Sequence, residues 1–451
     1  MSSVAAIDLG ATSGRVIVGA MSDGQLRLRH VARFPNTPVR VADGLHWDVL
    51  GLYSAAMTGL GKASREEGDG LLGAAVDSWA VDYGLLRGSR LLGNPYHYRD
   101  ARNAAAVAAV HAIVGPAELY RRNGLQHLPF NTVFQLVASA HVDELEVAER
   151  MLLVPDLIGY WATGKQAAER TNASTTGLLR VGGSGWDDEL IARLGLRRGL
   201  FPDLVDPGTL LGPVTAEVAS EFGISSTLGF TTVGSHDTAS AVVGVPATSA
   251  DVAFISCGTW SLVGTELVAP IASDEARDAG FTNEGGVDGR TRFLKNVMGL
   301  WILSESMRAW EKLGEQQELG TLLKQATEAP AGVPTFDASD PRLLAPGDMP
   351  SRIEALLVEQ GSCAPASIPE FVRSVLQSLA NAYADAVRDI ERLSGRTIRT
   401  VHIVGGGAQN ELLCQLTADT VGVGVVAGPV EATAIGNLMV QARTYSLVHG
   451  E

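Results

Sequence analysis

The chain has 451 residues, of which 46% are hydrophobic, and its 35 Lys and Arg against 50 Asp and Glu give a net charge of −15. This length suits roughly two or three domains of an α/β protein, and the acidic balance argues against nucleic acid or an anionic membrane as a partner. The three cysteines stand far apart, which excludes a disulfide framework and a zinc site and favours a reducing compartment. No signal peptide or long apolar run is apparent, so we expect a cytoplasmic protein.

Residues 4–19, VAAIDLGATSGRVIVG, predict an apolar strand, a turn of small residues and a second strand. Small turn residues leave backbone N–H groups open to an anion, and Thr12, Ser13 and Arg15 can bond phosphate oxygens. Asp8, at the end of the first strand, is placed to hold Mg²⁺ through waters. The missing Gly-Lys-Ser/Thr and the missing helix exclude a Walker A loop and a dinucleotide fingerprint. A plain glycine hairpin remains an equal interpretation.

The first half of the chain then alternates strand and helix signals. We expect loops to dominate residues 181–231, because Gly, Pro and Asp are frequent there. The expected strands are 71–78, 83–86 and 230–233, and the expected helices are 101–114, 131–148 and 155–163.

The second half restarts the opening pattern. Residues 252–266, VAFISCGTWSLVGTE, again predict strand, small turn with hydroxyls, and strand, which indicates an internal duplication. A domain boundary is expected at 246–251, just before this repeat. The expected later elements are a long amphipathic helix from about 367, ended by Gly395, a strand at 400–404, a helix from about 410, a strand at 423–426 and a helix at 431–446.

Residues 234–240, GSHDTAS, are the strongest catalytic candidate. Asp237 follows a strand among small residues, where a carboxylate can accept the proton of an attacking hydroxyl. His236 and Thr238 can hydrogen-bond a polyol. The alternative is a helix N-cap, because Asp or Ser followed by Thr-Ala-Ser-Ala-Val is a good helix start.

Two further patterns are open at this stage. The Gly405–Gly407 run after a strand is suited to a flat ligand lying against the backbone, or it is an ordinary strand-to-helix turn. Trp79 is a core residue or a sugar platform, and Asp77 and Asp82 are metal or polyol contacts, or only strand-end residues.

Together these motifs resemble the FGGY carbohydrate kinases. The likeness rests, in order from about residue 4 to about residue 442, on DLGATSGR (8–15), DSWAVDYGLL (77–86), YRDARN (98–103), GSHDTASAV (234–242), CGTWSLVG (257–264), TNEGG (282–286), KNVMGLW (295–301), HIVGGGAQN (402–410) and AGPVEATAIGN (427–437).

The resemblance implies two ribonuclease-H-like α/β domains, as in actin and Hsp70-type ATPases, flanking a catalytic cleft. We expect a mainly sugar-binding domain at 1–246 and a mainly ATP-binding domain at 247–451. The implied reaction is ATP- and Mg²⁺-dependent phosphorylation of a ketose, with L-rhamnulose the favoured acceptor. The expected partners are the ketose and ATP, and the expected state is a monomer or homodimer.

Roles carried over from the family follow the matching motifs. Asp237 would be the general base and Asp8 would orient the metal. The sugar would be held by Ala80 through its backbone, His236, Asp237, Thr238 and Asn296. The nucleotide would contact Ala11, Thr12, Ser13, Gly14, Arg15, Thr259, Gly405, Gly406 and Gly407.

Three features depart from the family pattern. Ala80 stands where Gly is usual, Ser304 stands where a nucleotide-contacting Gln is usual, and the chain stops soon after its last helix. The alternatives are therefore a kinase for fuculose, xylulose or another polyol, and a sugar or nucleotide sensor or an actin/Hsp70-like ATPase without sugar kinase activity.

Overall fold

The fold is described from a computed structural model for residues 2–22, 24–139, 143–183 and 185–448. The chain divides by its contacts into two units. The first contains Met1–Gly244, Leu267–Arg292 and Ala432–Glu451, and the second contains Val245–Glu266 and Phe293–Glu431. Two segments that come later in the chain are thus grouped with the first unit. The sugar-binding domain at 1–246 and the ATP-binding domain at 247–451 stay predictions.

The first unit is built on a six-stranded sheet with the order β12-β13-β6-β1-β2-β3. Strands β1, β6 and β13 are parallel, whereas β2 pairs antiparallel with β1 and β3 antiparallel with β2. The predicted opening hairpin and the strand at 71–78 are confirmed. The bounds are β1 Ser3–Leu9, β2 Ser13–Ser22, β3 Gln25–Pro35, β6 Leu71–Ser78, β12 Leu210–Pro213 and β13 Gly229–Thr231.

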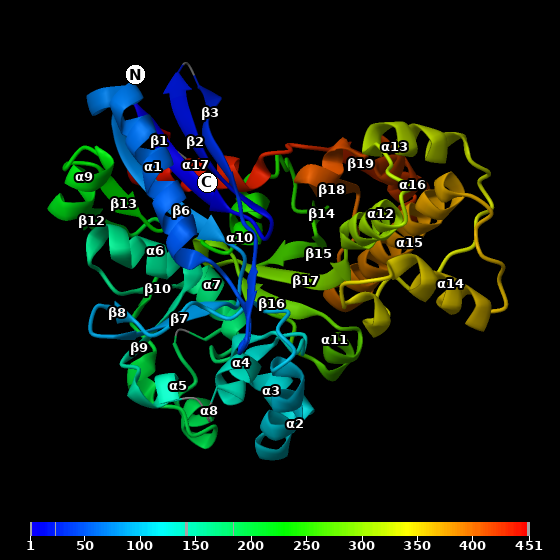
Figure 1. Cartoon of the computed structure of the whole chain (residues 1–451), viewed down its shortest axis with the longest axis horizontal. Helices are drawn as coiled ribbons and strands as arrows, with labels where there is room; N and C mark the ends of the chain where they lie inside the picture. The colour runs from blue at the N-terminus through cyan, green and yellow to red at the C-terminus, as the bar shows by residue number, and fades with distance from the viewer. Residues whose placement is uncertain (1, 23, 140–142, 184, 449–451) are drawn as a thin grey trace. The chain divides into compact units, whose positions relative to one another are not determined.

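Helices α1 (Val49–Glu67) and α17 (Ala432–Thr444) cover opposite faces of this sheet. Successive strand residues point to opposite faces. Ile7 on β1 therefore packs in one cluster with α1, while Ala6 packs with Leu438 of α17. Figure 1 shows the blue helix α1 beside the blue strands and α17 in red. The last helix of the chain thus completes the core of the first unit.

The remaining first-unit elements include the small sheet β8-β7-β9 and the pair β10-β11. Their bounds are β4 Val39–Val41, β5 Gly44–His46, β7 Tyr83–Arg87, β8 Arg90–Leu91, β9 Arg150–Leu153, β10 Ala168–Glu169, β11 Leu204–Val205, β16 Thr282–Gly285, α2 Asn103–Ile113, α3 Pro116–Asn123, α4 Thr132–Ala138, α5 Asp143–Val147, α6 Val154–Thr163, α7 Arg170–Ala173, α8 Asp188–Arg193, α9 Ala216–Phe222, α10 Asp237–Val243 and α11 Asp274–Asp278.

Two expectations for this unit were wrong in detail. The single helix expected over 131–148 is divided into α4, which ends at Ala138, and α5; residues 140–142 lie outside the described part. The loop-rich region 181–231 also contains regular elements. Helix α9 forms there because Thr215 caps its start and Gly223, in the left-handed conformation, ends it.

The second unit repeats the central topology of the first. Strand β14 (Val252–Cys257) pairs antiparallel with β15 (Trp260–Leu267) and parallel with β18 (Thr400–Val404), as β1 pairs with β2 and β6. Its strand order is β17-β15-β14-β18-β19, with β17 Thr291–Met298 beginning in the first unit and β19 Gly424–Ala427 at the edge. The predicted second hairpin is confirmed, and the shared topology supports an internal duplication.

The long helix α15 (Ile368–Ser394) packs against α16 (Glu411–Val421) and α13 (Leu319–Glu328). Ser367 caps its start, and Gly395, with φ +69°, ends it as predicted. The other helices of this unit are α12 Trp301–Lys312 and α14 Met349–Glu359. Within the described residues, no helix combines the length and hydropathy needed to cross a membrane.

Candidate active site

Three carboxylates of the first unit gather where its parallel strands end. Asp8 on β1 and Asp77 on β6 are paired neighbours in the sheet, and Asp237 opens α10 after β13. The last residue of β6 also bonds to the loop after β13, because Ser78 N donates to Ser235 O at 2.9 Å. Ligand sites of α/β sheets form at such carboxyl ends of strands. The sheet topology therefore groups two predicted site residues with Asp77.

Asp77 is fully buried, and its carboxylate lies beside that of Asp8 in the sheet. Burial and then the negative charge of Asp8 raise its pKa well above the usual value, and Asp237 adds to the effect. Asn437 of α17 donates to Asp77 Oδ2 at 2.6 Å, whereas Asp77 Oδ1 is buried with no hydrogen-bond partner among the described residues. An unpartnered buried carboxylate oxygen beside a second carboxylate fits a divalent cation.

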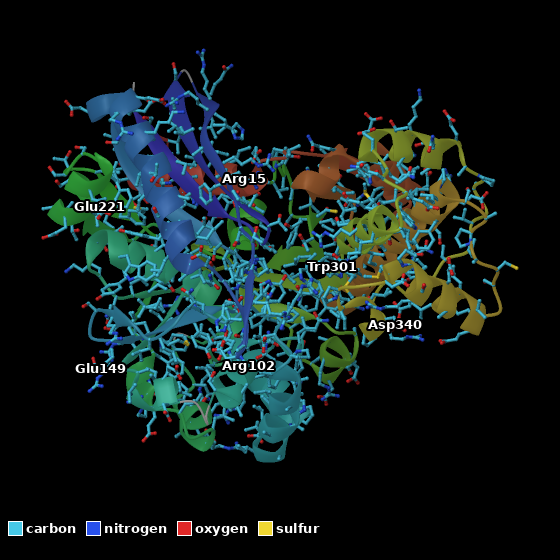
Figure 2. All side chains as sticks on the ribbon, in the orientation of Figure 1. Arg15, Arg102, Glu149, Glu221, Trp301 and Asp340 are labelled. Carbon is cyan, nitrogen blue, oxygen red and sulfur yellow. The ribbon has the colours of Figure 1, made fainter. Side chains whose placement is uncertain are left out.

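The opening hairpin presents Arg15 to Asp8. Arg15 Nε donates to Asp8 Oδ2 at 2.9 Å from the facing position on β2. Arg15 is labelled in Figure 2. The turn is closed by Gly10 N donating to Ser13 O, and Thr12 is exposed at its tip. Gly14 is required by packing, since a Cβ there would lie 2.2 Å from the ring of Phe34.

The loop that carries His236 and Asp237 is fixed from behind by Glu169. This fully buried carboxylate accepts from Ser235 N at 3.0 Å, from Ser235 Oγ at 2.6 Å and from Thr171 Oγ1 at 2.6 Å. His236 occupies the N-cap position of α10 without a side-chain cap bond, so Asp237 is the first helical residue rather than the cap.

Asp237 is partly exposed, and its contacts go to one oxygen. Thr238 Oγ1 donates to Asp237 Oδ1 at 3.1 Å, and His236 Nε2 lies 3.4 Å from the same atom. The side chain of Asp237 is 31% exposed, against 8% for His236. The carboxylate is thus oriented by its neighbours and accessible to a ligand.

Ala80 belongs to a strained turn. Asp82 N donates to Ala80 O at 2.9 Å, and Val81 between them has φ +68°, a conformation rare for a β-branched residue. Thr132 Oγ1 holds the turn by donating to Val81 O at 2.7 Å. Strain of this kind is retained where surrounding contacts impose it, often at functional sites.

Asp82 anchors this turn inside the core. Its Oδ2 accepts from Trp47 Nε1 at 2.6 Å and Trp79 Nε1 at 3.0 Å, and its Oδ1 accepts from Gln135 Nε2 at 2.7 Å. Burial, only partly offset by these donors, raises the pKa of Asp82 to about 7. Trp79 is therefore a core residue that orients Asp82.

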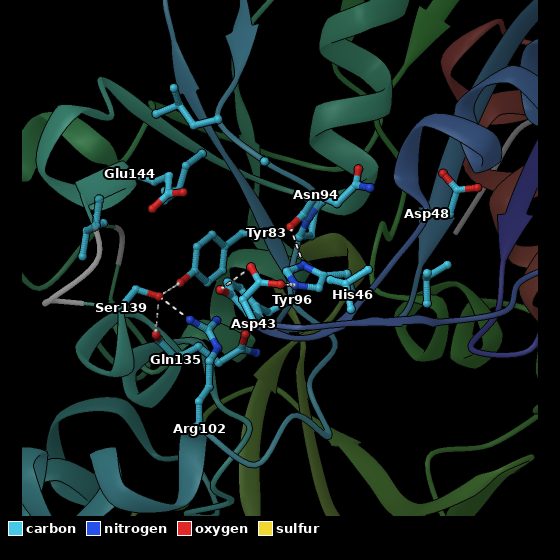
Figure 3. Close-up of a pocket in the computed structure, with 17 residues that line it drawn as sticks. Asp43, His46, Asp48, Tyr83, Asn94, Tyr96, Arg102, Gln135, Ser139 and Glu144 are labelled. Carbon is cyan, nitrogen blue, oxygen red and sulfur yellow. Dashed lines mark hydrogen bonds and ion pairs between the residues drawn. The ribbon is translucent and has the colours of Figure 1, made fainter.

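A separate cavity of about 500 Å³ is lined in part by Gln135, the residue that donates to Asp82 (Figure 3). Arg102 donates to Ser139 Oγ at 2.6 Å and stacks over the Tyr96 ring at 3.6 Å. None of the predicted site residues is among those that line this cavity. It is distinct from the strand-end carboxylates.

In the second unit, the predicted nucleotide residues meet around Cys257. Thr259 lies in the turn between β14 and β15, and the glycine run follows β18, the parallel neighbour of β14. Gly405 has φ +81°, and a Cβ on Gly407 would lie 2.1 Å from Cys257 Sγ. The glycines thus serve both a left-handed turn and close packing, with Gly406 facing open space.

The remaining predicted residue, Asn296, is half-buried on β17, and Ser304 is exposed on α12. Sequence reasoning missed Glu169 and gave Glu284 and Arg292 no role, although both lie beside His236. The TNEGG motif was a signal for Glu284. Glu169 had none, because its partner Ser235 is 66 residues away in the chain.

Comparison with known proteins gives matches over nearly the whole of this chain. The N-terminal domain of the FGGY family of carbohydrate kinases matches residues 3–244, and the C-terminal domain of that family matches residues 253–445. The rhamnulokinases of Bacteroides thetaiotaomicron, Pectobacterium atrosepticum and Enterococcus faecalis are 38%, 41% and 40% identical to the chain. These matches cover 97%, 96% and 97% of this chain and 90%, 86% and 88% of the respective relatives.

Solved structures agree on the fold. A ligand-bound xylulose kinase from Lactobacillus acidophilus has a TM-score of 0.82 at 17% identity, covering 100% of this chain and 91% of that protein. The Plasmodium falciparum glycerol kinase with ADP has a TM-score of 0.80 at 13% identity, with the same coverage. The chain belongs to the FGGY family of carbohydrate kinases.

Proposed function

We propose that this carbohydrate kinase transfers the γ-phosphoryl group of ATP to L-rhamnulose, forming L-rhamnulose 1-phosphate. The choice of L-rhamnulose as the acceptor is supported by the 38–41% identity, over nearly the whole chain, to relatives named rhamnulokinase. The enzyme would act in the cytoplasm on these two small molecules, as a monomer or homodimer.

In this reaction Asp237 is the general base. Its Oδ1 is held by Thr238 and faces His236, which leaves Oδ2 to accept the proton of the sugar hydroxyl. Proton transfer to a positioned carboxylate contributes about 10²–10⁴-fold to such reactions. The sugar oxygen then attacks the γ-phosphorus while the bond to the β-phosphate oxygen breaks.

The sugar is proposed to bind to His236, Thr238, Asn296 and the backbone of Ala80. The strained turn at Val81 supports this role for Ala80, because its contacts through Asp82 fix the backbone in one conformation. A preformed backbone contact costs little ordering when the substrate binds.

The phosphates are proposed to bind to Ala11, Thr12, Ser13, Gly14 and Arg15 and to Thr259, and the adenosine to Gly405–Gly407. Asp8, with Asp77 beside it, would hold Mg²⁺. No three His, Cys, Asp or Glu side chains of the described residues lie close enough together to hold one metal ion, so Asp237 is not counted as a ligand. Two carboxylates are sufficient for Mg²⁺, whose other ligands are usually waters and phosphate oxygens. When bound, the cation would offset negative charge on the phosphates.

One feature favours an acceptor other than L-rhamnulose. Ala80 stands where Gly is usual, and its methyl group narrows the proposed sugar-binding site. Steady-state ADP release by the purified chain with L-rhamnulose, L-fuculose, D-xylulose and glycerol separates the alternatives. We expect kcat/KM for L-rhamnulose to exceed the others at least about tenfold, the effect of about 1.4 kcal/mol in transition-state binding. A higher value for another sugar would replace the acceptor, and sugar-independent ADP release would reject the kinase assignment.

A further inference from the structure

A buried ion pair lies behind the proposed catalytic carboxylate. Arg292, on the first-unit part of β17, has a fully buried side chain, and Glu284 on β16 is 8% exposed. Arg292 Nη1 and Glu284 Oε2 are 3.2 Å apart, and Arg292 Nε donates to Gly285 O at 2.9 Å. Burial acts to raise the pKa of Glu284, but the net shift of that pKa is downward, and the charge of Arg292 is the largest cause that lowers it. Glu284 is therefore an anion that balances Arg292.

Both members of the pair approach the same atom of His236. Arg292 Nη2 lies 3.1 Å from His236 Nδ1, and Glu284 Oε2 lies 3.1 Å from it. A guanidinium only donates and a carboxylate only accepts, so the two contacts require opposite protonation of Nδ1. The Arg292 contact has hydrogen-bond geometry, whereas Glu284 Oε2 has no hydrogen-bond partner within the described residues.

We propose that Arg292 is a positioning residue that holds His236 as the neutral tautomer protonated on Nε2, aimed at Asp237. Donation from Arg292 to Nδ1 occupies its lone pair and places the ring proton on Nε2. Glu284 supplies the negative charge that lets the guanidinium be buried. The effect of this tautomer on catalysis rests on the proposed function, in which Asp237 is the general base.

The consequence falls on Asp237. Nε2–H faces Asp237 Oδ1 at 3.4 Å, on the same oxygen that Thr238 holds. The opposite tautomer would turn the Nε2 lone pair toward a carboxylate, and the two would repel each other. Arg292 thus acts through His236 to hold Asp237 with its second oxygen turned to the sugar.

The tautomer can be measured without turnover. Protein labelled with ¹⁵N only in histidine gives imidazole ¹H–¹⁵N correlation spectra in which protonated and bare ring nitrogens differ, and the His236→Asn variant identifies the His236 signals. We expect a protonated Nε2 and a bare Nδ1 at neutral pH. A protonated Nδ1, as the other tautomer or as imidazolium, would overturn the proposal.

Two variants test the cause. In Arg292→Met, Glu284 remains as the acceptor beside Nδ1, so the proton should move from Nε2 to Nδ1. In Glu284→Gln, Arg292 still donates and the tautomer should stay unchanged. Arg290→Met, at an exposed neighbouring arginine, is the matched control. An unchanged tautomer in Arg292→Met would reject the role of Arg292. If Arg292→Met does not fold, Glu284→Gln still tests the proposal. A move of the ring proton of His236 to Nδ1 in that variant would show that Glu284, and not Arg292, sets the tautomer.

Kinetics supply a separate readout. Arg292→Met should lower kcat roughly 10- to 100-fold, within the range of proton-transfer effects, while KM for ATP stays within about twofold. A fall in kcat accompanied by an equally large rise in the KM for ATP would indicate that Arg292 has a merely structural role. If the wild type has the expected tautomer but no L-rhamnulose activity, the proposed function fails and the positioning by Arg292 stands.

Discussion

At the scale of single residues, Asp237 is the proposed general base. Its neighbours hold one carboxylate oxygen and leave the other to react. Thr238 and His236 engage one carboxylate oxygen, and the side chain remains partly exposed. A residue with this exposure contributes little packing, so its substitution should affect the reaction more than the fold.

We therefore expect Asp237→Asn to lower kcat about 10²–10⁴-fold, because an amide cannot accept the sugar proton. Its thermal midpoint should stay within about 2 °C of wild type, as is usual for a substitution outside the core. Coupled ADP-release kinetics and thermal unfolding measure the two quantities, with Asp278→Asn, at an exposed carboxylate, as the control. Near-normal turnover in Asp237→Asn would remove Asp237 as the base.

Among the elements, the glycine turn after β18 shows how closely two strand ends approach. Gly407 and Gly406 are adjacent in sequence, yet a Cβ on Gly407 would lie 2.1 Å from Cys257 Sγ, whereas a Cβ on Gly406 would meet nothing within 4 Å. This difference provides a matched pair of substitutions one residue apart.

Gly407→Ala should destabilise the second unit by about 1–3 kcal/mol through overpacking and weaken ATP binding, while Gly406→Ala stays within about 0.5 kcal/mol. Urea unfolding and ATP titration of both variants provide the measurement. Cys257→Ala should restore part of the loss, because it removes the closest atom. Equal stability of the two glycine variants would mean that the turn does not pack against Cys257.

The sequence predicted elements best where the signal is local. Strand β6 has the expected bounds, and both hairpins and the caps of α15 follow from alternation, small turns and capping residues. Prediction failed where contacts distant in sequence decide the outcome. Glu169 has a role only because Ser235 folds onto it, and Arg292 acquires one only beside His236. The site residues carried over from the family stay predictions that the proposed experiments test.

For the whole molecule, buried carboxyl groups make stability depend on pH. Burial is the main cause that raises the pKa of Asp77, Asp82, Asp156 and Glu169, all in the first unit. Each of these carboxyl groups has a higher pKa in the folded than in the unfolded protein. Its contribution to the free energy of unfolding is therefore complete below the unfolded-state pKa and is lost as the pH rises through the folded-state pKa. For Asp82 this window runs from 3.8 to about 7.

Asp156 tests this relation, since its Oδ2 is buried without a hydrogen-bond partner among the described residues and Glu169 adds to its raised pKa. The Asp156→Asn variant cannot ionise, so its stability relative to wild type should increase between about pH 4 and pH 8, by about 1–3 kcal/mol. Chemical unfolding at the two pH values gives the difference, with the exposed Asp188→Asn as control. A constant difference would show that Asp156 does not titrate between them.

The packing of α17 on the first unit has a consequence for biosynthesis. This helix supplies Asn437 to Asp77 and Leu438 to the core under β1, yet it leaves the ribosome only after the second-unit residues Phe293–Glu431. Domains usually fold as their own residues emerge. Here the first-unit sheet, whose strands lie within residues 3–231, keeps one apolar face uncovered until α17 has been synthesised. A nascent chain stalled before residue 432 should therefore depend on chaperones, and premature termination there would release an incomplete first unit.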